Sequence, residues 1–228
     1  MRSFWIICFL GLLCSSKFAA GQRQHIPPEK VLQYETAIAS IDTTTYSSHK
    51  VIVANDTLAA AFYMAMTYFP ELHEQKIYLQ YGKIRTSMAA LPRIWSIFRK
   101  RDYREYKVII NGNMQKDPAI LVHTASFNAM VGVMGHELAH ILDYSTMSGL
   151  QIMWMGIRYL NKNYRKKIEW QTDTAAIARE FGWQLFDWIY FVAHEAEIDD
   201  TYRRYKLDIY MNPEDIYEII TKSQSNNE

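Results

Sequence analysis

The sequence contains few of the residues that mark specialised classes of protein. It has two cysteines, nine glycines and six prolines in 228 residues, and its formal net charge is +1. The scarcity of glycine and proline excludes collagen-like and linker-rich chains, and the near-neutral charge excludes a polycationic nucleic-acid-binding protein. No repeat with a period of about 20 to 50 residues is present, which excludes a solenoid. With 49% hydrophobic residues, the chain can form one compact domain with a sizeable core.

An apolar stretch of about ten residues lies at the N-terminus, over residues 4–13, and is too short to span a bilayer. Arg2 precedes this stretch, and three small residues follow it and end at Gly21. Positive charge, apolar run and small residues in this order are typical of a secretory signal peptide. We therefore expect residues 1–21 to be a signal peptide and residues 22–228 to form a single domain.

Both cysteines lie inside the predicted signal peptide, at Cys8 and Cys14, so the mature chain would have no thiol. Loss of Arg2 and Lys17 with the same segment would change the net charge from +1 to −1. An exported protein without disulfides must depend on its core or on a metal, which favours a periplasmic or secreted protein of a bacterial envelope. Cys14 is an alternative site of lipid attachment, although the residue before it is larger than such sites prefer.

The hydrophobic periodicity predicts strands and helices in the first half of the chain and helices alone in the second. Helices are predicted over residues 28–41, over residues 55–70 and beyond about residue 117, and strands over residues 50–54, 77–81 and 106–111. This order is typical of an α+β fold in which a small mixed sheet is followed by a mainly helical half. We expect the strands at 77–81 and 106–110 to be sheet edges on which a peptide can pair, with Arg85–Met88 lining the cleft.

The residues His136-Glu137-Leu138-Ala139-His140 form an H-E-x-x-H motif, and helical periodicity places both imidazoles opposite an apolar stripe. Two imidazoles one turn apart can bind one Zn²⁺, and a catalytic site then needs a third protein ligand and an open position. Glu169 and Asp173 offer two carboxylates one turn apart on a second predicted helix. Asp143, close beyond the motif, is an alternative ligand, a partner of a ligand histidine, or a helix-end hydrogen-bonding group.

This motif, followed 29 residues later by Glu169-x-x-x-Asp173 and Thr174-Ala175-Ala176-Ile177-Ala178, resembles the gluzincin zinc metallopeptidases. The resemblance is greatest to the group around the CAAX prenyl proteases and their bacterial relatives, and it covers roughly residues 130–180. It implies a zincin-like fold in which both motif histidines and Glu169 bind zinc, Glu137 is the general base, and Asp173 orients a ligand histidine. The membrane enzymes of that group have several spanning helices, whereas this chain would be a small exported relative.

The chemistry of the motif also favours a hydrolase when the resemblance is set aside. Glu137 is next to a ligand, so its carboxylate can take a proton from water at the metal and pass it to the leaving amine. An oxyanion then needs a hydrogen-bond donor, for which we select His194 ahead of Tyr144, Tyr202 and Arg203. We expect a zinc-dependent peptidase that acts on a peptide or protein, with no nucleic-acid partner. The alternative is a catalytically inactive, metal-stabilised envelope binding protein.

Two basic segments also require an interpretation. Residues 93–107 contain six basic side chains, but Asp102 and Glu105 interrupt them, which indicates a solvated loop rather than a nucleic-acid site. Residues 150–167 combine an apolar run that includes Trp154 with five basic side chains. They form either an amphipathic segment on an anionic membrane surface or a helix that flanks the cleft and packs Trp154 inside.

Overall fold

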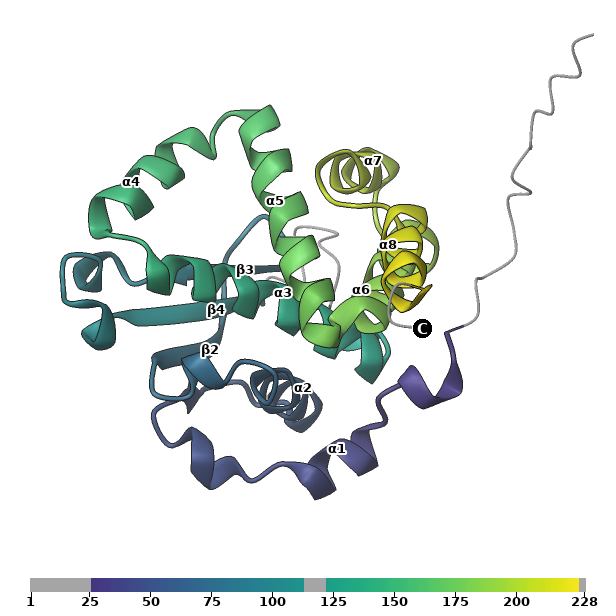
Figure 1. The fold of residues 1–228 in the computed structure, drawn as a ribbon, viewed down its shortest axis with the longest axis horizontal. Helices are drawn as coiled ribbons and strands as arrows, with labels where there is room; N and C mark the ends of the chain where they lie inside the picture. The colour runs from purple at the N-terminus through teal and green to yellow at the C-terminus, as the bar shows by residue number, and fades with distance from the viewer. Residues whose placement is uncertain (1–25, 113–121, 226–228) are drawn as a thin grey trace, which may run out of the picture.

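The computed structural model describes residues 26–112 and 122–225. The predicted signal peptide, with Cys14, lies outside the described residues. A four-stranded sheet is built from the first half of the chain, and the second half is helical (Figure 1). The structure therefore confirms an α+β fold with a small mixed sheet followed by a mainly helical half.

The sheet has the order β1-β2-β4-β3. Its strands are β1 (Lys50–Val51), β2 (Lys76–Gly82), β3 (Met88–Pro92) and β4 (Glu105–Asn111). The strands β1, β2 and β4 are parallel, and β3 runs antiparallel to β4 with Met88 opposite Ile110. The predicted edges were wrong, because residues 77–81 lie in β2 between β1 and β4, and residues 106–110 lie in β4 between β2 and β3. The free edge on the helical side is β3, which the sequence did not predict as a strand.

The elements of the first half match the predictions in type but differ in length. The predicted helix over 28–41 is divided into a 3₁₀ turn (Pro28–Lys30) and α1 (Tyr34–Ser40). The predicted strand over 50–54 is short because the chain leaves the sheet to begin α2 (Asp56–Met66), whose N-cap Asn55 accepts a hydrogen bond from the Leu58 N–H. The remaining 3₁₀ turns are Thr43–Tyr46, Pro70–Leu72, Ile94–Ser96, Arg101–Tyr103 and Val122–Thr124.

The described part of the second half contains helices joined by short connections and no strand, as predicted. Its α-helices are α3 (Phe127–Thr146), α4 (Gly149–Arg158), α5 (Lys162–Ala176), α6 (Gly182–Tyr190), α7 (Asp200–Ile209) and α8 (Pro213–Ser225). Two short π-helical turns, Ile177–Phe181 and Phe191–Glu195, flank α6. None of the helices in the described part of the chain has both the length and the hydrophobicity that a bilayer span needs.

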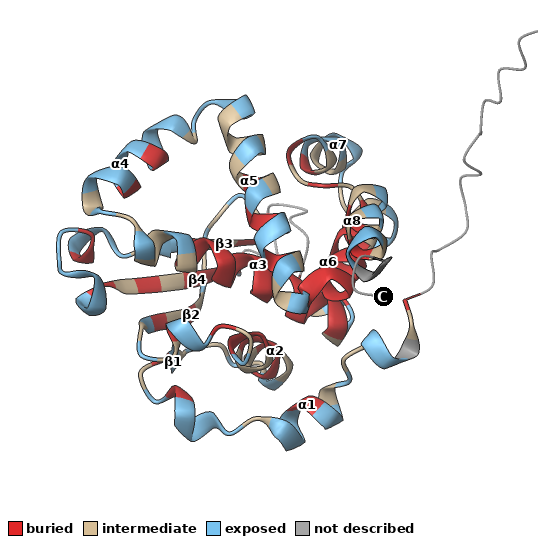
Figure 2. Cartoon of the chain, in the orientation of Figure 1, coloured by how far each residue is buried: buried red, intermediate tan, exposed pale blue. Residues whose placement is uncertain are grey.

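The helix α3 is the centre of the molecule. It packs against α2, α5, α6 and β3, and every residue from Asn128 to Ile141 is buried (Figure 2). The imidazole side of α3 is covered by α5. Close packing on the α6 side depends on two glycines: a β-carbon on Gly132 would lie 2.2 Å from the Gln184 carbonyl oxygen, and one on Gly135 would lie 2.7 Å from the Phe181 ring.

Candidate metal centre

Two helices supply the groups of the site. The central helix α3 begins at Ser126, whose hydroxyl caps the Ala129 N–H, and it carries the motif histidines near its middle. The helix α5 begins at Asn161, whose side chain accepts from the Tyr164 N–H, and it carries Glu169. Because α5 packs along α3, the carboxylate faces the imidazoles although 29 residues separate the two in sequence.

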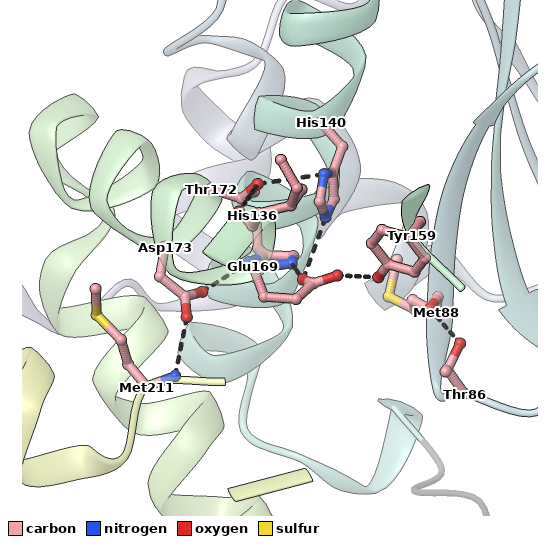
Figure 3. Close-up of polar contacts among 10 residues, drawn as sticks. Thr86, Met88, His136, His140, Tyr159, Glu169, Thr172, Asp173 and Met211 are labelled. Atoms are coloured by element: carbon pink, nitrogen blue, oxygen red, sulfur yellow. Dashed lines mark hydrogen bonds and ion pairs between the residues drawn. The ribbon is translucent and has the colours of Figure 1, made fainter. Parts of the chain in front are cut away.

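The two imidazoles and the carboxylate converge on one point, as Figure 3 shows. Glu169 Oε2 lies 3.1 Å from His136 Nε2 and 3.4 Å from His140 Nε2, and the three potential ligand atoms lie within 4.8 Å of one another. A tetrahedral Zn²⁺ with bonds of about 2.0–2.1 Å holds its ligand atoms roughly 3.3 Å apart. The spacing of these buried atoms therefore fits one metal ion, and the group can hold one.

His136 is hydrogen-bonded to Asp173, the residue that the gluzincin resemblance implied would orient a ligand histidine. His136 Nδ1 donates to Asp173 Oδ1 at 2.8 Å, and Asp173 Oδ2 accepts the Met211 N–H at 3.2 Å. Because a carboxylate can only accept, a neutral His136 that binds a metal through Nε2 has its proton on Nδ1, where Asp173 accepts it. The lone pair of Nε2 is then directed toward Glu169 and is available to a metal.

Thr172 forms the corresponding hydrogen bond with Nδ1 of His140. The Thr172 hydroxyl donates to the Ile168 carbonyl at 3.0 Å, so its oxygen accepts from His140 Nδ1, 3.2 Å away. The lone pair of His140 Nε2 is therefore also free to bind an ion. Glu169, Thr172 and Asp173 share one face of α5, because they occupy positions i, i+3 and i+4.

Glu169 is held by a third group that the sequence did not reveal. The Tyr159 hydroxyl, at the C-terminal end of α4, donates a short hydrogen bond to Glu169 Oε1. This bond occupies one carboxylate oxygen and leaves the other, Oε2, facing the two imidazoles. Burial and the neighbouring carboxylate raise the pKa of Tyr159 well above its usual range, so the hydroxyl stays protonated and remains a donor.

The electrostatics of the group favour a cation at this point. Burial disfavours the charged form of His136, but hydrogen bonds and charge from Asp173 and Glu169 outweigh burial and raise its pKa to about 10. Burial opposes the charged form of Glu169 as well, and the two imidazoles nevertheless hold its pKa well below the usual range. The buried carboxylates thus require a positive charge between them, which a proton or a metal ion can supply.

Glu137 is buried beside this group and is not part of it. Its side chain lines the walls of two cavities, one of them shared with Lys206, whose ammonium lies 4.1 Å from the Tyr210 ring centroid. Burial raises the pKa of Glu137, and the charges of the two imidazoles and of Lys206 act against this rise. Burial lowers the pKa of Lys206, whereas the surrounding carboxylates act to raise it.

The larger cavity, of ≈ 510 Å³, extends from the candidate metal ligands to the molecular surface. One wall is the β3 edge with Thr86 before it, and the opposite wall is α4, through Ile152 and Met155. The prediction that residues 85–88 line the cleft is confirmed for Thr86 and Met88, whereas Ser87 lines the smaller cavity and Arg85 lines neither. Within the segment 150–167, residues 152–159 flank the cleft, but the prediction that Trp154 packs inside was wrong, because its side chain is 61% exposed.

The structure separates other predicted residues from the site. Asp143 is exposed and lies outside the group of ligand atoms that converge. His194, selected as the oxyanion donor, is exposed after α6 with its ring 4.6 Å from that of Tyr190, and it lines neither cavity beside Glu137. The Arg203 guanidinium is occupied by the carbonyls of Val192 and Ala196.

Among the donors first considered, Tyr144 is the one that the fold brings to the cleft. It lines the larger cavity, and its ring is stacked on that of His140 with centroids 6.3 Å apart. Tyr210 also reaches the group, with its ring centroid 5.7 Å from that of His136. Tyr159 and Tyr210 come from α4 and from the connection after α7, and no local sequence pattern links either of them to the motif.

Comparisons with protein-family models, with curated proteins and with solved structures return no match for this chain. The site is therefore defined by its own geometry, as a buried group of two histidines and one glutamate that can hold a metal ion.

Proposed function

We propose that the protein is a zinc-dependent peptidase of the gluzincin type with a zincin-like domain. The observation that carries this proposal is the convergence of His136 Nε2, His140 Nε2 and Glu169 Oε2 beside the buried carboxylate of Glu137. These groups lie at the inner end of a cleft that is bordered by a free strand edge. A metal, a base and a place for an extended peptide are the three requirements of metal-assisted peptide hydrolysis.

Zinc is the metal that the donor set favours. Two neutral imidazoles and one carboxylate are the ligands of a known class of catalytic zinc site, and hard-oxygen cations such as Mg²⁺ prefer all-oxygen ligands. When held by His136, His140 and Glu169, zinc would supply Lewis acidity and lower the pKa of water.

Glu137 has the position and the environment of a general base. Its carboxylate can take a proton from the attacking water and donate it to the amine that leaves. Burial raises the pKa of Glu137 and so brings it closer to neutral pH. A base with such a pKa can both accept the proton from water and release it to the amine. Tyr144, which lies in the same cavity, is the donor that we assign to the oxyanion in place of His194.

The edge strand β3 is where a substrate would bind. Among the described residues β3 pairs with β4 on one side, and residues 88–92 line the cavity on the other. Alternate backbone N–H and C=O groups of such an edge are available to an extended peptide, which would lie antiparallel or parallel to β3. The apolar wall formed by Ile152 and Met155 favours substrates with hydrophobic side chains near the scissile bond.

Export remains part of the proposal because of the sequence pattern of residues 1–21, which predicts a periplasmic or secreted protein. If the protein purified from its native cells were cytoplasmic and still carried residues 1–21, export would be contradicted. The proposal about the metal site would not be affected.

The experiment that tests the function is the Glu137→Gln substitution, assayed by mass spectrometry on a complex mixture of peptides. The variant keeps the size of the side chain and removes the base, so we expect peptide cleavage to fall about 10²–10⁴-fold while zinc content is unchanged. Asp143→Asn, at an exposed carboxylate outside the group, is the matched control and should keep full activity.

Two results would contradict the proposal. Equal cleavage by the wild-type and Glu137→Gln proteins would exclude Glu137 as the base. A wild-type protein that binds zinc and cleaves no peptide in the mixture would favour the inactive, metal-stabilised binding protein instead.

A further inference from the structure

We infer that a surface beside the mouth of the cleft binds anionic lipid membranes. This surface, here the apolar rim, consists of Ile94, Trp95 and Phe98 in the β3–β4 connection and Leu150, Trp154 and Ile157 on α4. All six side chains are exposed. Only Ile94 among them also lines the cavity, and none takes part in the proposed chemistry, so lipid binding is tested independently of peptide cleavage.

The helix α4 has two apolar faces. Ile152 and Met155 are buried in the cavity wall, as in an ordinary surface helix. A second stripe at positions i, i+3, i+4 and i+7 faces solvent, and it consists of Leu150, Met153, Trp154 and Ile157. A stripe with this spacing is normally turned toward a core. In Figure 2 the ribbon of α4 is coloured as exposed over most of its length.

The β3–β4 connection extends the same surface. Trp95 is 88% exposed and Phe98 is 71% exposed, which is unusual for large apolar side chains. The connection lies against the start of α4, because a β-carbon on Gly149 would be 2.7 Å from the Ile97 carbonyl oxygen. The Arg104 guanidinium also donates to the Met147 carbonyl just before α4. Figure 1 shows α4 and this connection side by side.

Basic residues are concentrated in the two segments that carry the apolar rim and at the start of α5, which follows α4. Residues 93–104 have five basic side chains and one acidic, and residues 145–168 have five basic and none acidic, so the two segments carry +9 in a chain of net charge +1. Glu105 and Asp208 form ion pairs with basic residues of these segments, and Arg104 is buried, so the exposed charge falls from +9 to +6. The remainder of the chain therefore has an excess of acidic residues.

This combination fits a lipid surface better than the other partners. Exposed tryptophan and aliphatic side chains bordered by lysine and arginine are typical of helices that lie in an anionic membrane interface. Aliphatic side chains such as Leu150 and Ile157 have no role in stacking on nucleic-acid bases. A symmetric dimer would place two surfaces of charge +6 against each other, which disfavours a second copy of this chain.

The test is sedimentation of the full chain with vesicles of phosphatidylcholine that contain about 30 mol% phosphatidylserine. The variant Trp95→Ser/Trp154→Ser should bind at least about tenfold more weakly than the wild-type protein, because both indoles of the apolar rim are exposed. The control Ile38→Ser/Ile52→Ser removes two side chains that are 48% and 52% exposed elsewhere, and it should bind as the wild type does. All three proteins share the same N-terminal segment, so that segment does not affect the comparison.

The electrostatic part is tested with Lys100→Glu/Lys167→Glu, two exposed positions. We expect this variant to bind the anionic vesicles about tenfold more weakly than the wild type. On vesicles of pure phosphatidylcholine the wild type should bind little more than the Trp95→Ser/Trp154→Ser protein does. Salt should release the wild type from the anionic vesicles.

Equal binding of the wild-type and Trp95→Ser/Trp154→Ser proteins would overturn the inference, and so would an equal loss in the control. A dimer that this variant dissociates, or retention on single-stranded nucleic acid, without vesicle binding in either case, would assign the surface to another partner. None of these measurements uses turnover, so they fail or succeed separately from the peptidase proposal.

Discussion

Replacement of Asp173 by asparagine should weaken metal binding about 10–100-fold, which corresponds to about 1.4–2.7 kcal/mol. The reason is in the hydrogen bonds of this fully buried side chain, whose two oxygens accept from His136 Nδ1 and from the Met211 N–H. An amide has one acceptor oxygen and one donor nitrogen, so it cannot accept from both partners. If the amide nitrogen faces His136, the imidazole proton must move to Nε2, where it blocks the metal.

If the amide nitrogen instead faces the Met211 N–H, two donors oppose each other in a buried position, which costs about 1–3 kcal/mol of folding free energy. Both orientations therefore destabilise the metal-bound folded state. The assay is competition for Zn²⁺ with a chromogenic chelator, combined with circular dichroism to show that the Asp173→Asn protein is folded.

Asp187→Asn is the matched control. Asp187 is also buried, and it accepts from Ser126 Oγ at 2.6 Å and from Asn128 Nδ2 at 3.2 Å, away from the imidazoles. This variant should lose stability and keep its zinc affinity. A folded Asp173→Asn protein with the zinc affinity of the wild type would refute the assignment of Asp173 as the residue that orients His136.

Three further predictions concern stability, measured as free energies of unfolding in urea. Gly132→Ala should destabilise the fold by about 1–3 kcal/mol, because the new methyl group would meet the Gln184 carbonyl; an unchanged value would show that α3 and α6 can separate freely. Burial lowers the pKa of His49 from 6.5 to about 4, so between these pH values the unfolded chain binds more protons than the folded protein does. The free energy of unfolding should therefore be highest above pH 6.5 and fall by up to about 3 kcal/mol toward pH 4. His49→Gln should reduce this fall while His194→Gln, at an exposed position, should not, and identical acid profiles would refute the prediction. Glu180 has φ = 71°, so Glu180→Val should destabilise by about 1–2 kcal/mol relative to Glu180→Gly, and the reverse order would argue against a left-handed residue there.

The sequence predicted those parts of the site that depend on spacing along one helix. The imidazoles at i and i+4 on α3, and Glu169 with Asp173 at i and i+4 on α5, share faces as the helical repeat requires. The same rule would have identified Thr172, which lies at i+3 from Glu169. Tyr159 could not be found in this way, because the turn between α4 and α5, and not a helical repeat, brings its hydroxyl to Glu169.

The sheet shows the limit of local patterns more clearly. The segments that form β2 and β4 were recognised from their alternating β-branched and aromatic residues, but their position inside the sheet depends on pairing between distant segments. The strand β3 (Met88–Pro92) has two alanines and a proline, which gives little β propensity. Pro92 is nevertheless informative, because proline in a sheet is confined to edges and strand ends. His194 was misassigned for a related reason, since an apolar run in sequence does not say which side of the fold its histidine faces.

The central claim is that His136 Nε2, His140 Nε2 and Glu169 Oε2 hold one metal ion. Anomalous scattering at the zinc absorption edge, from crystals of the protein grown with Zn²⁺, tests it directly. We predict a single strong peak about 2.0–2.2 Å from each of these three atoms. The absence of a peak between them, or a peak bound instead to Asp143 or other surface carboxylates, would contradict the account.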